Sequence, residues 1–245
     1  MRDAHVHMGY YPRMGHEVPF YYSPSRILGV MNRCGIQEFI VSSTCAQIAD
    51  ISRQDILREA KEMKRVAGVR AHVFFWLSGR LYDEDRGLRF LETGLFEGIK
   101  LHERETPWNS KRKNDLERIV AIAEERQLPV QFHCGGPESC MPLSLAKIAE
   151  KFPRVHFDFA HCNPMRDMAK VVARLPNVWT DTACLRDDDW NMIFDLDWHG
   201  RLLFGTDFPA YHSKIIGTFT GEYKKIMKRF LKDADAAFND YLARR

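Results

Sequence analysis

The stretch EFIVSS, residues 38–43, is a short apolar run of the length expected for a buried strand. A longer amphipathic segment at 50–66 follows it, and a second short apolar run, RAHVFFW, occupies residues 70–76. A strand, a helix and a second strand in this order predict a unit of parallel sheet. The same pattern continues in both directions along the chain and gives six further strand candidates: 3–7, 97–102, 129–133, 155–160, 177–182 and 201–205.

Five more segments have apolar residues three and four positions apart, as helices require: 83–93, 112–127, 142–152, 165–175 and 220–230. Eight strands that alternate with helices in a chain of 245 residues predict one α/β domain over residues 1–245, with the fold of a (β/α)8 TIM barrel. An open doubly wound sheet is the alternative. The aromatic, irregular stretch 8–23 is predicted to be a loop over one mouth of the barrel.

The composition limits the partners of the chain. It carries 36 basic and 33 acidic residues, with the basic residues scattered among the acids, so neither nucleic acid nor an anionic membrane is implied. The six cysteines contain no CxxC pair, which favours reduced thiols. No signal-peptide pattern opens the chain, and no apolar run reaches the roughly 18 residues needed to span a bilayer. These observations predict a soluble, cytoplasmic protein that binds a small molecule, and they leave a homodimer open.

Polar residues stand where the predicted strands end. In a barrel of this kind the loops at the carboxyl ends of the strands carry the function. Alternate side chains of a strand share a face, so we expect each pair separated by one residue to point the same way, into the barrel. The residues at these ends are His5 and His7, Lys100 and His102, His133, His161 and Asp207.

This set of residues predicts a metal site. Two imidazoles on one strand face can bind a single ion, and a third imidazole with a carboxylate from other strands would complete a site of nitrogen and oxygen ligands. Zinc is the expected ion, and manganese and iron accept the same ligands. A single His-x-His pair is weak evidence, because such histidines are more often ordinary core or surface residues. The prediction therefore depends on five ligand-type residues together, at the ends of four predicted strands: His5, His7, His133, His161 and Asp207.

Five motifs in this order, DAHVH, GIKLH, QFHCG, AHCN and GTDFP, cover residues 3–209 and resemble the amidohydrolase superfamily, specifically its amidohydrolase-2 branch of TIM-barrel metal-dependent hydrolases. The resemblance implies that the metal ligands are His5, His7, His133 and Asp207. It also implies that His161 contacts substrate, activates water or joins a second metal. Because only four residues precede His5, no flanking β-sandwich is expected.

Lys100 is the residue whose role the resemblance leaves open. In binuclear amidohydrolases a lysine on this strand is carbamylated and bridges two ions, whereas in the amidohydrolase-2 branch a GIKLH-like strand often accompanies one ion. We favour one ion, with Lys100 as a cation that binds an anionic substrate group and whose charge the ion disfavours. A structural ion pair with Glu97 or Glu103 is the alternative. The other candidates for substrate binding are His102, Arg80 and Arg186, and one arginine is expected to touch substrate.

The predicted function is that of a metal-dependent hydrolase, which acts through a metal-bound water on a C–O or C–N bond of a small, anionic organic substrate. Asp207 would bind the ion and transfer the proton of the water. His161, assisted by His102, would stabilise the developing oxyanion. Two alternatives remain: a metal-dependent decarboxylase or hydratase of the same branch, and a non-catalytic barrel that binds metal.

Overall fold

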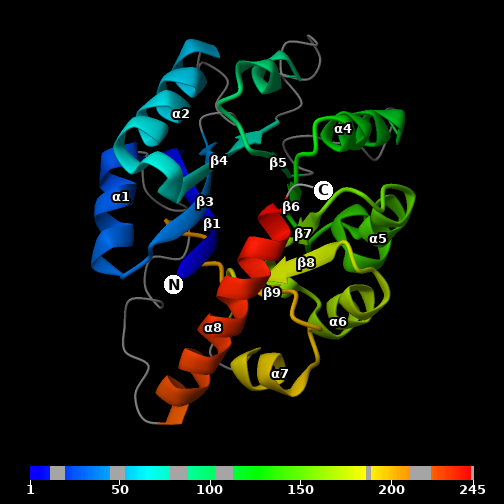
Figure 1. Cartoon of the computed structure of the whole chain (residues 1–245). Coiled ribbons are helices and arrows are strands. Elements are labelled where there is room, and N and C mark those ends of the chain that lie inside the picture. Colours follow the sequence, from blue (N-terminus) through cyan, green and yellow to red (C-terminus); the bar gives the residue numbers. More distant parts are fainter. Residues whose placement is uncertain are drawn as a thin grey trace.

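The computed structural model describes residues 1–11, 20–44, 53–77, 88–102, 113–185, 189–209 and 222–243, and these residues contain one nine-stranded sheet (Figure 1). The strand order is β2-β1-β3-β4-β5-β6-β7-β8-β9. β2 is antiparallel to β1, and all other pairings are parallel. The strands are β1 (Arg2–Tyr11), β2 (Phe20–Tyr22), β3 (Glu38–Ser43), β4 (Ala71–Trp76), β5 (Gly98–Leu101), β6 (Val130–Phe132), β7 (Phe157–Phe159), β8 (Val178–Asp181) and β9 (Leu202–Leu203).

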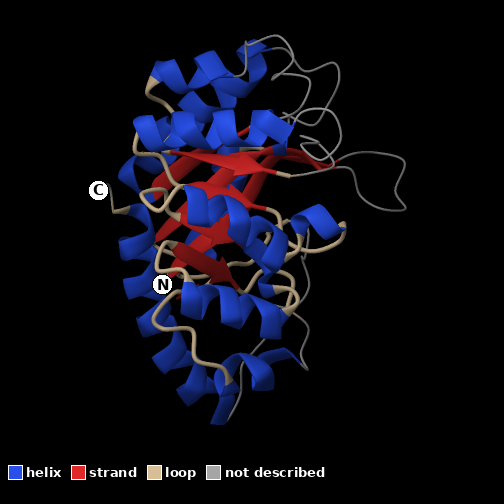
Figure 2. Ribbon diagram, turned by 90° about the vertical axis from the view of Figure 1, so that its right-hand side faces the viewer, coloured by secondary structure: helices blue, strands red, loops and turns tan. Residues whose placement is uncertain are grey.

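Helices surround the strands, as Figure 2 shows. They are α1 (Pro24–Arg33), α2 (Arg53–Ala67), α4 (Lys113–Glu125), α5 (Pro142–Lys151), α6 (Met165–Arg174), α7 (Asp189–Asp195) and α8 (Glu222–Leu242). Short 3-10 segments connect some of these elements: η2 (Gly68–Arg70), η3 (Leu88–Thr93), η4 (Glu138–Cys140) and η5 (Ala160–Cys162). No helix within the described ranges combines the length and the apolar character needed to cross a bilayer.

The predicted alternation of strands and helices is confirmed. Each of the eight predicted strand regions contains a strand, and the region 38–43 has the bounds of β3. The predicted loop at 8–23 is wrong in part, because β1 continues to Tyr11 and pairs with β2. This hairpin begins where the parallel pairing of β1 with β3 ends, at Met8 and Ser43, and it extends β1 beyond the rest of the sheet.

The helices differ from the prediction in three ways. The region 83–93 contains the 3-10 segment η3, and residues 83–87 lie outside the described part of the chain. The predicted helices also omitted α1 and α7. α1 carries its own start signal, since Ser23 accepts a hydrogen bond from the backbone of Arg26 and Pro24 occupies the first turn. Its buried residues Ile27, Val30 and Met31 have helical spacing.

The third difference concerns α8, which extends to Leu242 where the prediction ended at 230. The extra turns bury Ala237, Phe238 and Tyr241 in a second apolar cluster. This cluster also contains one side chain from each of five strands: Ala4, Ile40, Phe74, Trp179 and Leu203. α8 therefore packs onto the inner residues near the amino ends of the strands, and Figure 1 shows it crossing the sheet.

Backbone hydrogen bonds connect β1 to the segment that follows β9. Ala4 N donates to Phe204 O at 2.7 Å, and His7 N donates to Phe208 O at 2.7 Å. In the opposite direction, Asp207 N donates to His5 O at 2.8 Å. The first and last parallel segments are therefore joined to each other beside the two histidines of β1.

Gly98 leaves room for the ring of Phe74 on the neighbouring strand. A Cβ atom added at Gly98 would lie 2.5 Å from Cζ of Phe74, which is fully buried. We expect Gly98→Ala to lower the free energy of unfolding by roughly 1–3 kcal/mol, because neither group can move without disturbing the core. Urea unfolding measures this change. Gly29→Ala is the matched control: its Cβ would meet only Arg33 Nη1 at 3.6 Å, so stability should be unchanged or higher. Equal stabilities for the two variants would contradict the packing argument.

Candidate metal centre

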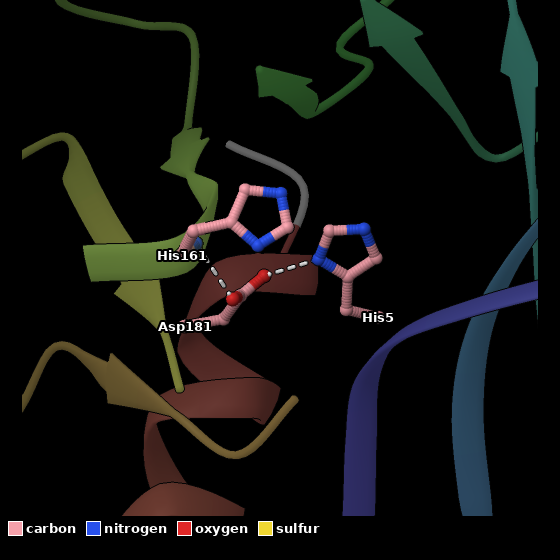
Figure 3. A group of neighbouring side chains, drawn as sticks. All are labelled: His5, His161 and Asp181. Atoms are coloured by element: carbon pink, nitrogen blue, oxygen red, sulfur yellow. Dashed lines mark hydrogen bonds and ion pairs between the residues drawn. The ribbon is translucent and has the colours of Figure 1, made fainter. Parts of the chain in front are cut away.

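His5 and His7 lie on β1 and turn their Nε2 atoms toward each other, 3.2 Å apart. The Nδ1 atom of each ring contacts a second polar side chain. His5 Nδ1 donates to Asp181 Oδ2 at 2.8 Å, as Figure 3 shows, and His7 Nδ1 is 2.9 Å from Ser42 Oγ. Because the proton of His5 is on Nδ1, its Nε2 presents a lone pair toward the interior. The predicted common orientation of the two rings is confirmed.

Asp207 brings a carboxylate to the same point. Its Oδ1 lies 2.9 Å from His7 Nε2 and 3.6 Å from His5 Nε2. The ligand atoms of these three residues all lie within 4.8 Å of one another, and all three residues are buried. Donor atoms at this separation can share one metal ion, so the structure assembles three of the four predicted ligands in one group.

His133, the fourth predicted ligand, contacts a different histidine. Its Nδ1 is 2.9 Å from Nε2 of His161, and its ring stacks on the ring of His102 with centroids 4.0 Å apart. His133 belongs to none of the candidate ligand groups formed by the described residues. Its role as a ligand therefore stays a prediction, and so does the role of His102 in substrate binding. The ring of His102 also stacks on Trp76, at 6.0 Å.

Asp181 is a functional candidate that the sequence analysis missed. Its carboxylate accepts hydrogen bonds from His5 Nδ1, from the backbone of His161 at 2.9 Å and from the backbone of Ala183 at 2.9 Å. It forms a second ligand-type group with His5 and His161 (Figure 3). A signal for it exists in the sequence, since it is a carboxylate within the predicted strand 177–182, close to the strand's carboxyl end.

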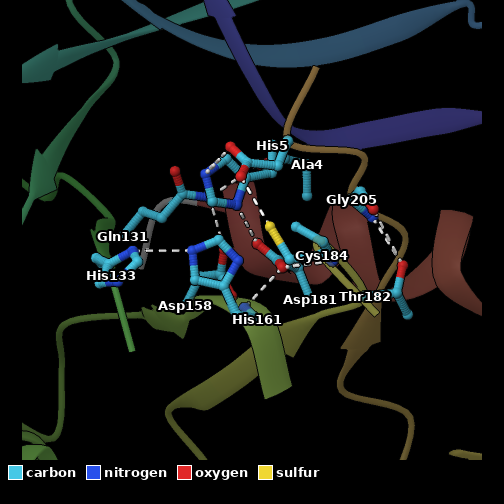
Figure 4. Close-up of polar contacts among 12 residues, drawn as sticks. Ala4, His5, Gln131, His133, Asp158, His161, Asp181, Thr182, Cys184 and Gly205 are labelled. Carbon is cyan, nitrogen blue, oxygen red and sulfur yellow. Dashed lines mark hydrogen bonds and ion pairs between the residues drawn. The ribbon is translucent and has the colours of Figure 1, made fainter. Parts of the chain in front are cut away.

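Cys184 was also missed. Its Sγ donates to Asp207 Oδ2 at 2.8 Å, and it forms a third ligand-type group with His161 and Asp207. Figure 4 shows Cys184 beside His161 and Asp181. These three residues share a left-handed backbone, with φ of 63°, 73° and 54°. Such a backbone is uncommon outside glycine and clusters at functional sites. The left-handed backbone depends on the local turn that follows each strand. The periodicity of strand residues in the sequence therefore does not predict it.

Lys100 is buried, and its Nζ lies 3.1 Å from His5 Nε2. The proposed ion pair with Glu97 is wrong, because Glu97 contacts Lys64 and His72 instead. Glu103 lies outside the described residues. Burial lowers the pKa of Lys100, although the carboxylates of Asp181 and Asp207 act in the opposite direction. The ammonium therefore contacts a ligand of the candidate metal group directly.

The histidines of the site favour the neutral form. Burial, ahead of the charge of Lys100, lowers the pKa of His5. Burial also lowers the pKa of His7, and burial followed by the charge of His5 lowers the pKa of His161 to about 4. A neutral imidazole has the lone pair that metal coordination needs.

The two carboxylates of the site favour the ionised form. Burial alone would raise the pKa of Asp207, but His5 and the hydrogen bond from His7 outweigh it and hold this pKa well below the usual range. Burial opposes ionisation of Asp181 as well, and the charge and hydrogen bond of His5 lower its pKa. Neutral imidazoles beside ionised carboxylates are a donor set that fits a divalent cation.

The two predicted arginines, Arg80 and Arg186, lie outside the described residues. Their expected contact with substrate remains a prediction.

Comparison with known proteins identifies the family of the chain. A family model described as "Amidohydrolase" matches residues 44–237, which is more than half of the chain. The chain belongs to the amidohydrolase family. The match begins after β1, so the His5 and His7 pair is evidence from outside the matched region. Membership of this family supports an enzymatic function.

Several solved structures share the fold. They include a probable 2-pyrone-4,6-dicarboxylic acid hydrolase from Acinetobacter baumannii, with 12% sequence identity, a TM-score of 0.57 and coverage of 100% of this chain and 96% of the other. A dihydroorotase from Campylobacter jejuni has 13% identity, a TM-score of 0.61 and coverage of 98% and 80%. A 4-oxalomesaconate hydratase from Rhodopseudomonas palustris has 13% identity, a TM-score of 0.58 and coverage of 98% of both chains. A search of curated protein sequences finds no match.

Asp3 connects β1 to the segment that carries Asp207, and the shift of its pKa can be tested. Its carboxylate accepts hydrogen bonds from the backbone of His5, the backbone of Thr206 and Thr206 Oγ1. Burial raises its pKa from 3.8 to about 7. The folded state therefore keeps this proton to higher pH than the unfolded state, and stability falls as pH rises from about 4 through 7.

We expect Asp3→Asn to flatten this part of the pH profile, because Asn does not titrate, its Oδ1 can accept both backbone bonds and its Nδ2 can donate to Thr206 Oγ1. Relative to the wild type, its free energy of unfolding should rise by up to about 4 kcal/mol between pH 4 and pH 8. Urea unfolding at both pH values, in the presence of a chelator, measures the difference. A constant difference between the two proteins across this range would show that Asp3 is ionised in the folded state throughout.

Proposed function

We propose that this chain is a metal-dependent hydrolase that cleaves a C–O or C–N bond of a small, anionic organic substrate. The observation that carries the proposal is the convergence of His5 Nε2, His7 Nε2 and Asp207 Oδ1. These residues would hold one ion, and zinc is the expected metal. A divalent ion bound there would supply acidified water at neutral pH and polarise the bond to be broken.

Side chains of the site would accept the proton of the attacking water and orient the substrate. Asp207 is ionised and has a second oxygen, Oδ2, that accepts a hydrogen bond from Cys184 Sγ. An ionised carboxylate can accept a proton during attack on the substrate, and the interactions that lower the pKa of Asp207 make it a weak base in that role. His161 is neutral at pH 7 because its pKa is about 4, so it can orient or polarise a substrate but is not a ready proton donor.

We further propose that the sheet closes as the (β/α)8 barrel that the sequence predicts. The backbone bonds from Ala4 to Phe204 and from His7 to Phe208 support closure, since they join β1 to the segment after β9. The isolated parallel bridge between Val6 and Phe208 supports it as well. In a closed barrel the candidate metal centre would lie at the carboxyl ends of the strands, where barrel enzymes carry their catalytic residues.

The first test is activity and metal content together. Metal-depleted protein would be reloaded with zinc, manganese or iron and assayed against lactones, amides and unsaturated acids, with products identified by mass. We expect hydrolysis that a chelator abolishes, and we expect Asp207→Asn to lower the rate by about 10²–10⁴-fold because it removes the proton acceptor and an ionic ligand. Release of carbon dioxide, or hydration of a double bond, would show that the protein is a lyase and not a hydrolase. Full activity in the chelator would end the proposal.

A second test concerns Asp181, which orients His5 without belonging to the first ligand group. We expect Asp181→Asn to weaken metal binding by about 10–100-fold, because the amide cannot hold His5 Nδ1–H as strongly as a carboxylate. Competition with a chromophoric chelator measures the affinity. Asp240→Asn on the exposed face of α8 is the matched control and should bind metal like the wild type. Wild-type affinity in Asp181→Asn would assign Asp181 to the fold alone.

A further inference from the structure

His161, Cys184 and Asp207 make a compact group that the proposed hydrolytic site does not use as a unit. Each residue follows a different strand, β7, β8 or β9. Their ligand atoms lie within 4.8 Å of one another, and Cys184 Sγ is 2.8 Å from Asp207 Oδ2. Nitrogen, sulfur and oxygen donors at these separations match the ligand types of a four-coordinate divalent ion.

A second observation points into the same group. Nδ1 of His161 is buried and has no hydrogen-bond partner among the described residues. Because His161 is only 8% exposed, solvent does not readily supply a partner either. Its other nitrogen, Nε2, contacts His133. In Figure 4 the Nδ1 side of the ring faces Asp181 and Cys184. A buried nitrogen without a partner costs free energy, and a ligand in the group would remove that cost.

The carboxylate of Asp207 separates this group from the first one. Its Oδ1 faces His5 and His7, and its Oδ2 faces Cys184. Each oxygen therefore belongs to a different set of donors. One carboxylate can serve two neighbouring positions in this way, with imidazole donors on one side and a thiol with an imidazole on the other.

We propose that His161, Cys184 and Asp207 form a second cation position, with a thiolate donor that suits a soft or borderline divalent ion such as zinc or cadmium. The sulfur ligand gives this position a chemistry different from that of the first, which has only nitrogen and oxygen donors. Binding releases the thiol proton of Cys184 to solvent, and the thiolate then donates an electron pair to the ion. The inference rests on the proposed metal site only in sharing Asp207.

The competing role for Cys184 is that of a hydrogen-bond donor that orients Asp207. Cys184→Ser separates the two roles, since a hydroxyl can donate to Asp207 but is a poor ligand for a soft ion. Metal-depleted wild type and variant would be titrated with cadmium and with cobalt(II). Bound metal would be counted by elemental analysis, and sulfur-to-metal charge-transfer absorption would be recorded in the ultraviolet.

We expect two equivalents and a charge-transfer band in the wild type, and one equivalent without the band in Cys184→Ser. Cys34→Ser, at the end of α1, is the matched thiol control. It should bind two equivalents of metal and show the charge-transfer band, as the wild type does. Cys184→Ala should behave like Cys184→Ser, and circular dichroism checks that each variant is folded.

Two equivalents and a band in Cys184→Ser would overturn the inference, as would one equivalent in the wild type, with or without a band. One equivalent without a band leaves the first ion position in place. Binding of no ion by the wild type would reject the proposed metal-dependent function as well.

Discussion

Two ionised carboxylates, Asp181 and Asp207, are buried together where the strands end, and this charge must be compensated inside the protein. Burying an uncompensated charge costs several kcal/mol. Lys100 is the ammonium that the described residues place against this cluster, and burial lowers its pKa, which weakens the compensation. Burial also lowers the pKa of His5 and of His7, which reduces the positive charge that these imidazoles can supply. The positive charge of these side chains therefore does not fully balance the two carboxylates. A divalent cation bound among them would supply the remaining positive charge.

The fold assigns different tasks to the two ends of the sheet. At the amino ends, Phe238 and Tyr241 of α8 fill the interior with apolar contacts, and Arg2 N donates to Asp235 Oδ1 of the same helix at 2.8 Å. At the carboxyl ends, polar side chains fill the interior instead. Asp3 connects these layers, because it holds the backbone of His5 and of Thr206. The apolar packing of one end thus holds in place a polar cluster that would not fold by itself.

The sequence predicts the parts of the site that depend on strand periodicity. The shared face of His5 and His7 follows from their separation by one residue, and Asp207 follows from the end of the last strand. Cys184 was not predicted, because it lies beyond the end of β8 and in none of the five motifs. His161 and Asp207 have the same left-handed backbone but stand in the motifs AHCN and GTDFP. The contact of Lys100 with His5 was missed for another reason: it depends on how the side chains pack across the interior, which sequence spacing does not encode. The end of α8 was missed because its apolar residues pack against five strands distant in sequence.

Asp207 connects the chemistry of the site to its metal content. Its Oδ1 faces two imidazoles and its Oδ2 receives a thiol, so neither oxygen is free of a partner. A hydrogen bond to the ionised form stabilises that form and weakens the carboxylate as a base. Loss of the thiol proton on binding a second cation would replace this bond with an ion at the same oxygen, which weakens the base further. The proton-accepting strength of Asp207 would then depend on whether Cys184 is a thiol or a bound thiolate. In that case the reactivity of the site would depend on Cys184, the side chain that follows β8.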